Sequence, residues 1–164
     1  MGKNIEIEFK FQIPDNSRIE KFLNNLKFIC TKRIVDTYLD TNEGNLYKKG
    51  IFIRLRDNQT LDFKYNLETV RNLGKKDMHE HCEEYSFPLP LAGIFLNAVN
   101  QNCRILDLRE ISKPDLKELK SKNNLIDSVI IDKIRQKFED GKFEYSFDDV
   151  KGLGKFIEIE FLAS

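Results

Sequence analysis

Strict alternation of apolar and polar residues is the feature that most constrains the fold of this chain. Near the N-terminus, charged residues separate a row of apolar ones, namely Ile5, Ile7, Phe9 and Phe11. A period of two places apolar side chains on one face of a β-strand and polar ones on the other. Similar runs predict seven further strands, at about 33–40, 50–57, 60–67, 79–87, 126–138, 142–150 and 155–162. Because most of these follow one another directly along the chain, we expect an antiparallel sheet.

Helical spacing of apolar residues is confined to a few segments. The predicted helices begin at the capping box of residues 17–20, cover residues 90–102, and cover residues 112–124 with Ser112 as N-cap. Polar segments without this periodicity are interpreted as hairpin turns or loops, at 57–59, 139–142 and 66–79. Together the patterns predict an α+β fold whose sheet is strongly curved or closed.

Composition limits the class of protein and of partner. The 164 residues suit one domain, expected to span residues 1–164. Because 27 basic residues balance 27 acidic ones, no overall charge indicates a nucleic-acid partner. No apolar run approaches the roughly 20 residues that cross a membrane, and the N-terminus lacks the apolar stretch of a signal peptide. Three widely spaced cysteines are typical of reduced thiols. We therefore expect a cytoplasmic monomer or homodimer, with no nucleic-acid or membrane partner.

The charges on the predicted strands gather by sign, as Glu-x-Glu near both ends of the chain and as Arg-x-Arg between them. One interpretation is an ordinary solvated sheet face, whose cross-strand pairs each contribute about 0.2–1 kcal/mol. The other is a closed sheet with its polar face inward, since an eight-stranded barrel is wide enough for one small ligand. In such a tunnel, carboxylates suit Mg²⁺ or Mn²⁺, and arginine and lysine suit phosphate oxygens.

The sequence resembles a known family. Glu6-Ile7-Glu8-Phe9-Lys10 is similar to the Glu-x-Glu-x-Lys signature of the CYTH superfamily, also called triphosphate tunnel metalloenzymes. Further blocks that resemble the family follow in order, at residues 36–56, 61–64, 82–87, 132–135 and 143–161. The resemblance covers nearly the whole chain, and its 36–41 segment is especially similar to the thiamine-triphosphatase branch.

The resemblance implies a closed eight-stranded antiparallel β-barrel, a tunnel with helices packed outside, that binds a small-molecule triphosphate with Mg²⁺ or Mn²⁺. It implies that basic residues hold the phosphates: Lys10, Arg54, Arg56, Lys64, Lys133 and Arg135. It implies that carboxylates hold the metal: Glu6, Glu8, Asp148, Glu158 and Glu160. Near the reacting phosphate it places a tyrosine–lysine pair, Tyr38 and Lys10, and it implies that Glu84, also a catalytic candidate, assists the metal-binding carboxylates.

Three functions stay open on the sequence. The expected one is metal-dependent hydrolysis of a triphosphate, which is inorganic tripolyphosphate, thiamine triphosphate or a nucleoside triphosphate. The first alternative is a class IV-type adenylyl cyclase that makes cyclic AMP from ATP, but no evident residue pattern for binding adenine supports it. The second is a non-catalytic module that binds a phosphoanion.

Overall fold

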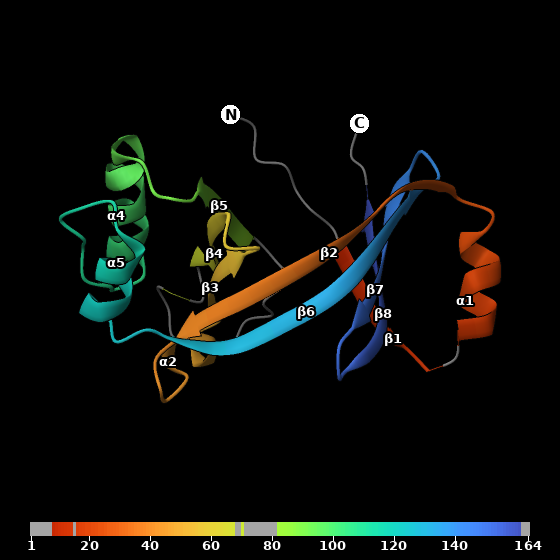
Figure 1. Ribbon diagram of the computed structural model, residues 1–164, viewed down its shortest axis with the longest axis horizontal. Helices are drawn as coiled ribbons and strands as arrows, with labels where there is room; N and C mark the ends of the chain where they lie inside the picture. The colour runs from red at the N-terminus through yellow and green to blue at the C-terminus, as the bar shows by residue number, and fades with distance from the viewer. Residues whose placement is uncertain (1–7, 15, 68–69, 71–81, 162–164) are drawn as a thin grey trace. The chain divides into compact units, whose positions relative to one another are not determined.

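The computed structural model describes residues 8–14, 16–67, 70 and 82–161. These residues form one antiparallel sheet of eight strands in the order β1-β8-β7-β6-β2-β3-β4-β5 (Figure 1). The strands are β1 (Glu8–Ile13), β2 (Lys27–Asp40), β3 (Ile51–Arg56), β4 (Thr60–Asn66), β5 (Cys82–Pro88), β6 (Ile126–Glu139), β7 (Phe143–Val150) and β8 (Gly154–Phe161). The helices are α1 (Asn16–Leu23), α2 (Asn45–Lys48), the 3-10 turn η1 (Gly93–Phe95), α4 (Leu96–Ile105) and α5 (Leu116–Lys122). None of the described helices has the length and apolar character needed to cross a membrane.

The chain divides into two compact units. The first unit comprises Met1–Ile34 and Ile131–Ser164, and the second unit comprises Val35–Ile130. Strands β2 and β6 each contribute residues to both units. The α+β class and the eight-stranded antiparallel sheet are confirmed, whereas closure of the sheet into a barrel stays a prediction.

The core of the second unit lies between β3–β5 and the helices α4 and α5. On β3 every second side chain is buried, at Ile51, Ile53 and Leu55. These residues share a core with Val99 of α4 and Leu119 of α5, which are also buried. Because strand side chains alternate, the charged residues between them lie on the opposite face of the sheet.

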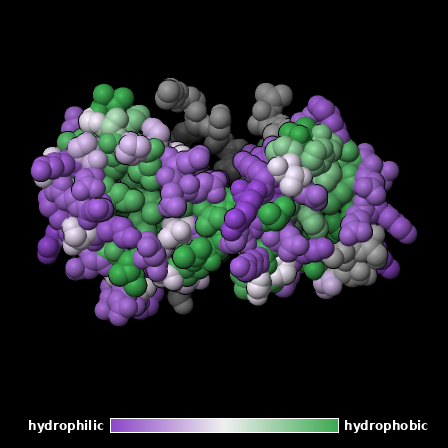
Figure 2. Space-filling view, viewed as in Figure 1, coloured by the Kyte–Doolittle hydropathy of each residue, from purple (hydrophilic) through white to green (hydrophobic). Residues whose placement is uncertain are grey.

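The core of the first unit lies under α1. Leu23 of this helix packs with Phe138 of β6, Tyr145 and Phe147 of β7, and Ile157 of β8. The aromatic residues of β7 therefore belong to the core, as the alternation predicts, and the polar residues of β7 and β8 lie on the other face. Apolar side chains also reach the mainly hydrophilic surface of the molecule in places (Figure 2).

The strand predictions agree with the structure, with one large shift. Strand β2 begins at Lys27, not at residue 33, and runs for 14 residues beside the equally long β6. The alternation of apolar residues is weak in this first part of β2, where most side chains are exposed. Pairing with a neighbouring strand extends β2 beyond what its own pattern indicates. Most of the predicted loop 66–79 lies outside the described residues.

The predicted helix at 90–102 begins later than expected. Helix α4 starts at Leu96, after the turn η1, whereas Ala92 is still extended. The prolines at 88 and 90 disfavour helical geometry only in the residues before them, 87 and 89, so the extended backbone at Ala92 is a feature that the residue spacing did not indicate.

The predicted N-cap Ser112 is also wrong. Asp115 caps α5 by accepting a 2.9 Å hydrogen bond from the amide of Lys117. The amide and hydroxyl of Ser112 instead donate to Glu118, at 2.9 and 2.8 Å. These bonds and the Lys122 ammonium lower the pKa of Glu118 to about 2, with Lys122 as the largest cause. The N-cap therefore lies three residues further along the chain than the sequence pattern indicates.

The short helix α2 was not predicted. The buried carboxylate of Asp40 holds it, accepting hydrogen bonds from the amides of Leu46 at 2.8 Å and Tyr47 at 3.0 Å. A helix of four residues shows no periodicity, and the carboxylate that accepts from its amides lies at the end of the preceding strand. Sequence patterns therefore carry little signal for it.

The turn between β3 and β4 offers a test of backbone strain. Asp57 and Asn58 both have φ of 53°, in the region that non-glycine residues adopt with difficulty. We expect Asn58→Ala to lower the free energy of unfolding by about 1 kcal/mol, and Asn58→Gly to keep or raise it. Urea denaturation measures both. Gln59→Ala, in the same turn but without positive φ, is the control and should change stability by less than about 0.5 kcal/mol.

Candidate functional site

The polar face of the second unit gathers charged residues from four neighbouring strands. Strand register places Arg56 opposite Asp36, and Arg54 opposite both Tyr38 and Asp62. The next pairings place Lys64 opposite Glu84, and Asp62 opposite Ser86. Three basic and three acidic side chains thus share one face, with no net formal charge.

Arg56 is held by one buried carboxylate. Its Nε and Nη2 donate to the two oxygens of Asp36, at 2.8 and 3.0 Å. Asp36 is only 2% exposed. Two parallel bonds of this kind fix the plane of a guanidinium group as well as its position. Arg56 therefore has a defined orientation on the polar face.

Arg54 is surrounded by three carboxylates. Its Nε and Nη2 both donate to Oδ2 of Asp62, at 2.9 and 2.7 Å, and Nη2 also donates to Glu84 at 3.2 Å. Asp36 lies 3.7 Å from its Nε. Burial acts to lower the pKa of Arg54, but the hydrogen bond to Asp62 and the nearby aspartate charges outweigh it and raise this pKa. Arg54 is therefore a permanent cation.

The predicted Tyr38 and Lys64 lie on the same face. Tyr38 is half-buried, with its ring edge-on to Phe52 at a centroid distance of 6.4 Å. Lys64 Nζ lies 3.6 Å from Glu84. The second unit thus brings five predicted site residues onto one surface: Tyr38, Arg54, Arg56, Lys64 and Glu84.

The first unit carries a buried ionic network on its own polar face. Asp148 accepts from Arg135 Nε at 2.6 Å, from Arg135 Nη2 at 2.7 Å and from Lys133 Nζ at 2.7 Å. All three residues are buried, Asp148 almost completely. Burial acts to raise the pKa of Asp148, but these hydrogen bonds outweigh it and the pKa is lowered. For Lys133 burial dominates instead and lowers the pKa, despite the bond to Asp148.

Glu158 joins this network to Lys10. Its Oε2 accepts from Arg135 Nη2 at 2.7 Å and from Lys10 Nζ at 3.2 Å. Burial acts to raise the pKa of Glu158, but the charges of Arg135, Lys10 and Lys133 outweigh it, so the pKa is lowered and the carboxylate is ionised near neutral pH. Strand register places Glu160 opposite Glu8 and Glu144, and Lys137 donates to Glu144.

The predicted site residues therefore form two groups, one on each unit. The group on the first unit comprises Lys10, Lys133, Arg135, Asp148, Glu158 and Glu160. Glu6 lies outside the described residues, as does the side chain of Glu8. The sequence did not single out Asp36 and Asp62, which hold the two arginines of the second unit. Their positions two residues from Tyr38 and Lys64, on the same strand faces, were the available signal.

The described carboxylates fit a divalent cation by their chemistry. No group of three or more potential ligands converges within the part of the chain that the structure describes. Mg²⁺, however, commonly binds through one or two carboxylates together with the phosphates of its substrate. Glu158 and Glu160, on one face of β8, can supply these oxygens. A metal at Asp148 would have to displace Arg135 or Lys133, because both oxygens of Asp148 already accept hydrogen bonds.

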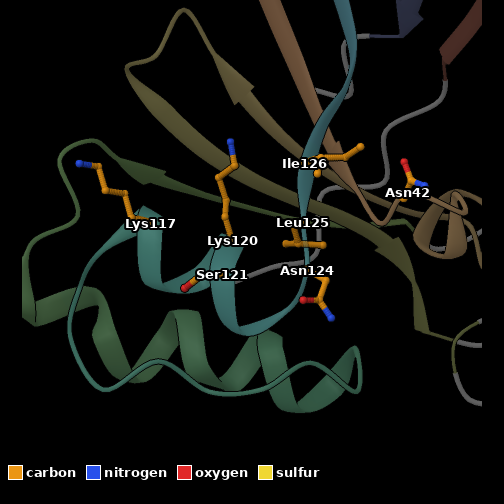
Figure 3. Close-up of a pocket in the computed structure, with 7 residues that line it drawn as sticks. All are labelled: Asn42, Lys117, Lys120, Ser121, Asn124, Leu125 and Ile126. Atoms are coloured by element: carbon orange, nitrogen blue, oxygen red, sulfur yellow. The ribbon is translucent and has the colours of Figure 1, made fainter.

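A separate groove of about 590 Å³ lies beside α5 in the second unit (Figure 3). It is lined by Asn42, Lys117, Lys120, Ser121, Asn124, Leu125 and Ile126. The ammonium of Lys120 is 2.7 Å from Asp127, so a carboxylate of this chain already pairs with it. None of the predicted site residues lines this groove, and we assign no part of the chemistry to it.

Similar proteins were found among solved structures. One is from Bacillus halodurans and described as a proposed adenylate cyclase (18% identical, TM-score 0.62, covering 99% of this chain and 83% of that chain). Another is from Pyrococcus horikoshii (17%, TM-score 0.59, covering 97% and 79%). A third, from Hippeastrum, is named a proposed adenylyl cyclase and described as having a dominant triphosphatase activity (16%, TM-score 0.56, covering 97% and 79%). At these identities the likeness shows a common fold.

Two comparisons of the sequence also identify related proteins. A curated protein of Methanocaldococcus jannaschii, named as a proposed adenylate cyclase, is 23% identical over 158 residues, which are 95% of this chain and 76% of the relative. The family profile of the CYTH domain matches residues 4–164. The match covers nearly the whole chain and includes the segments that carry both groups of charged residues, so this protein belongs to the CYTH domain family.

Proposed function

We propose that this protein hydrolyses a linear triphosphate in a metal-dependent reaction. The observation that carries the proposal is the placement of arginine and lysine side chains on the polar sheet faces, where carboxylates hold them in defined orientations. A polyanion with several phosphoryl groups matches such a set of fixed cations. CYTH domain proteins are typically enzymes, and a described activity of one structural neighbour is that of a triphosphatase.

In this proposal the eight-stranded sheet closes into a tunnel whose polar faces line the interior. An eight-stranded barrel leaves room for one small ligand. The polar character of one face in each unit supports closure, because a closed sheet would let these faces line the interior. The helices α1, α4 and α5 then cover the apolar faces on the outside.

The residues have distinct roles in the proposed reaction. Basic side chains bind and orient the phosphates: Lys10, Arg54, Arg56, Lys64, Lys133 and Arg135. Lys10 and Tyr38 act near the phosphoryl group that is transferred, and Glu84 adjusts the charge beside Arg54 and Lys64. Glu158 and Glu160, together with Glu6 and Glu8, would hold Mg²⁺ or Mn²⁺, and the bound ion would neutralise phosphoryl charge. Positioning and charge stabilisation account for most of the rate in phosphoryl transfer, so no covalent step is required of the protein.

A substrate panel tests the proposal directly. The protein is incubated with tripolyphosphate, thiamine triphosphate or ATP, each with Mg²⁺ or Mn²⁺, and with EDTA as the metal-free control. We expect release of inorganic phosphate that EDTA abolishes. Formation of cyclic AMP and pyrophosphate from ATP would favour the cyclase, the activity named for the relatives from Methanocaldococcus and Bacillus. Tight binding without turnover of any compound would favour the non-catalytic module that binds a phosphoanion.

A further inference from the structure

We propose that the buried aspartates Asp36 and Asp62 are positioning residues, which aim the guanidinium groups of Arg56 and Arg54 at the phosphates. The inference deepens the proposed function and rests on it. It concerns the second unit alone, where all four side chains lie on the polar face of β2, β3 and β4.

Both arginines are held through the same edge. Arg56 donates from Nε and Nη2 to Asp36, and Arg54 donates from Nε and Nη2 to Asp62. None of these four bonds uses Nη1. A guanidinium group is a planar fork with five N–H donors, so a carboxylate on the Nε–Nη2 edge leaves the opposite donors available to a ligand.

The two aspartates are placed so that they hold the arginines without repelling an approaching phosphate at the surface. Their side chains are 3% and 4% exposed, whereas those of Arg56 and Arg54 are 32% and 15% exposed. A phosphate that approaches from solvent therefore meets the arginines before it meets the carboxylates. Asp62 is itself held, because its second oxygen accepts a 2.8 Å hydrogen bond from the Ser86 hydroxyl of β5. The pair Arg56–Asp36 and the chain Arg54–Asp62–Ser86 thus link four strands, β2 to β5, and fix the orientation of two cations.

Loss of Asp62 has a predictable consequence because other carboxylates surround Arg54. Glu84 lies 3.2 Å from Nη2 and Asp36 lies 3.7 Å from Nε. Without Asp62, the guanidinium group can turn toward these neighbours and direct its remaining donors away from a ligand. Neutralising Asp62 also removes one negative charge, but that charge is already paired with Arg54 at 2.7 Å. We therefore expect weaker binding, not tighter binding, when Asp62 is changed.

The test measures binding of tripolyphosphate in EDTA by calorimetry, where metal-dependent turnover is absent. We expect Asp62→Asn and Asp62→Glu each to weaken binding about tenfold, since both move or remove one charge-assisted bond. Ser86→Ala, a milder change, should weaken it about two- to threefold. In an Arg54→Ala background, Asp62→Asn should no longer weaken binding, because a positioning residue acts only through its arginine and the carboxylate left without Arg54 repels the polyanion.

A matched control and a spectroscopic readout separate orientation from folding. Asp132→Asn breaks an Arg33–Asp132 pair with the same Nε and Nη2 geometry, at 2.8 Å each, and should leave binding unchanged. Asp132 precedes Lys133 on β6 and therefore lies on the opposite face of that strand. The Nε–H proton resonance of Arg54 should be protected from exchange in the wild type and lose protection in Ser86→Ala and Asp62→Asn, while the backbone amides of β3 and β4 stay protected as in the wild type.

The outcomes that overturn the inference differ from those that overturn the proposed function. If Asp62→Glu binds like the wild type and Asp62→Asn binds more tightly, Asp62 contributes charge alone. If Asp62→Asn weakens binding equally in the Arg54→Ala background, it acts through the fold. Either result defeats the inference while the triphosphate site stands. A wild-type protein that does not bind tripolyphosphate at all, with or without metal, defeats the proposed function instead.

Discussion

Replacing Asp148 with asparagine is expected to lower the free energy of unfolding by about 3–5 kcal/mol, because it removes one member of a buried ionic network. Asp148 is 1% exposed and accepts hydrogen bonds from both Arg135 and Lys133, which are themselves buried. Asparagine keeps the volume but not the charge, so the two cations lose the carboxylate that offsets their burial. Urea denaturation at pH 7 measures the change.

The pH dependence provides a second signature of the same prediction. The pKa of Asp148 is lowered in the folded protein, so its ionised form contributes stability above its unfolded pKa of about 4. That contribution is lost as the pH falls further, through the folded pKa. The difference in stability between the wild type and Asp148→Asn should therefore shrink from pH 7 toward pH 2.

The neighbouring residue supplies the control. Asp149 is exposed and points to the other face of β7, so Asp149→Asn should change stability by less than about 0.5 kcal/mol. Equal stability of the two variants at pH 7 would mean that the network around Asp148 does not stabilise the fold.

Periodicity predicted the sheet because burial on one face is enough to reveal a strand. On β3, alternate burial of Ile51, Ile53 and Leu55 is the direct counterpart of the sequence pattern. The errors arose where a distant or neighbouring residue decides the local structure. Asp40 holds α2 from the preceding strand, and Asp115 competes successfully with Ser112 for the N-cap of α5. The cap at Asp115 is a local contact with the amide of Lys117, so the error there was a choice between two nearby polar residues that residue spacing did not decide.

For the candidate site, alternation places a charge on a face but does not say which charges meet. Arg54 and Arg56 were identified from the strand pattern and the family resemblance, yet their partners depend on strand register. The turn at Asp57 and Asn58 aligns β3 with β4 and so sets Arg54 opposite Asp62. Asp36 comes from β2, on the other side of β3, and its pairing with Arg56 has no local signal. The supporting aspartates therefore emerged only with the structure.

Replacing Glu158 with glutamine is expected to lower kcat/KM for the proposed triphosphate hydrolysis about 100-fold at limiting Mg²⁺. The lowered pKa of Glu158 keeps this carboxylate ionised near neutral pH. Glutamine retains the shape and one carbonyl acceptor for Arg135 and Lys10, so the loss falls mainly on the negative charge. Hydrolysis measured across a Mg²⁺ titration therefore reports on the metal.

The response of Glu158→Gln to added Mg²⁺ distinguishes a role of Glu158 as a metal ligand from a role in orienting Arg135. Loss of a metal ligand weakens metal affinity, so raised Mg²⁺ should recover part of the activity of Glu158→Gln. Loss of orientation at Arg135 alone would instead give a deficit that Mg²⁺ does not change, and would contradict the metal assignment. Full activity with the wild-type Mg²⁺ dependence would contradict any role for this carboxylate.

Glu110→Gln, which changes an exposed glutamate paired with Arg104, controls for a general effect of losing one negative charge. Because the charge change is the same in both variants, a Mg²⁺-dependent deficit confined to Glu158→Gln assigns the metal to this carboxylate.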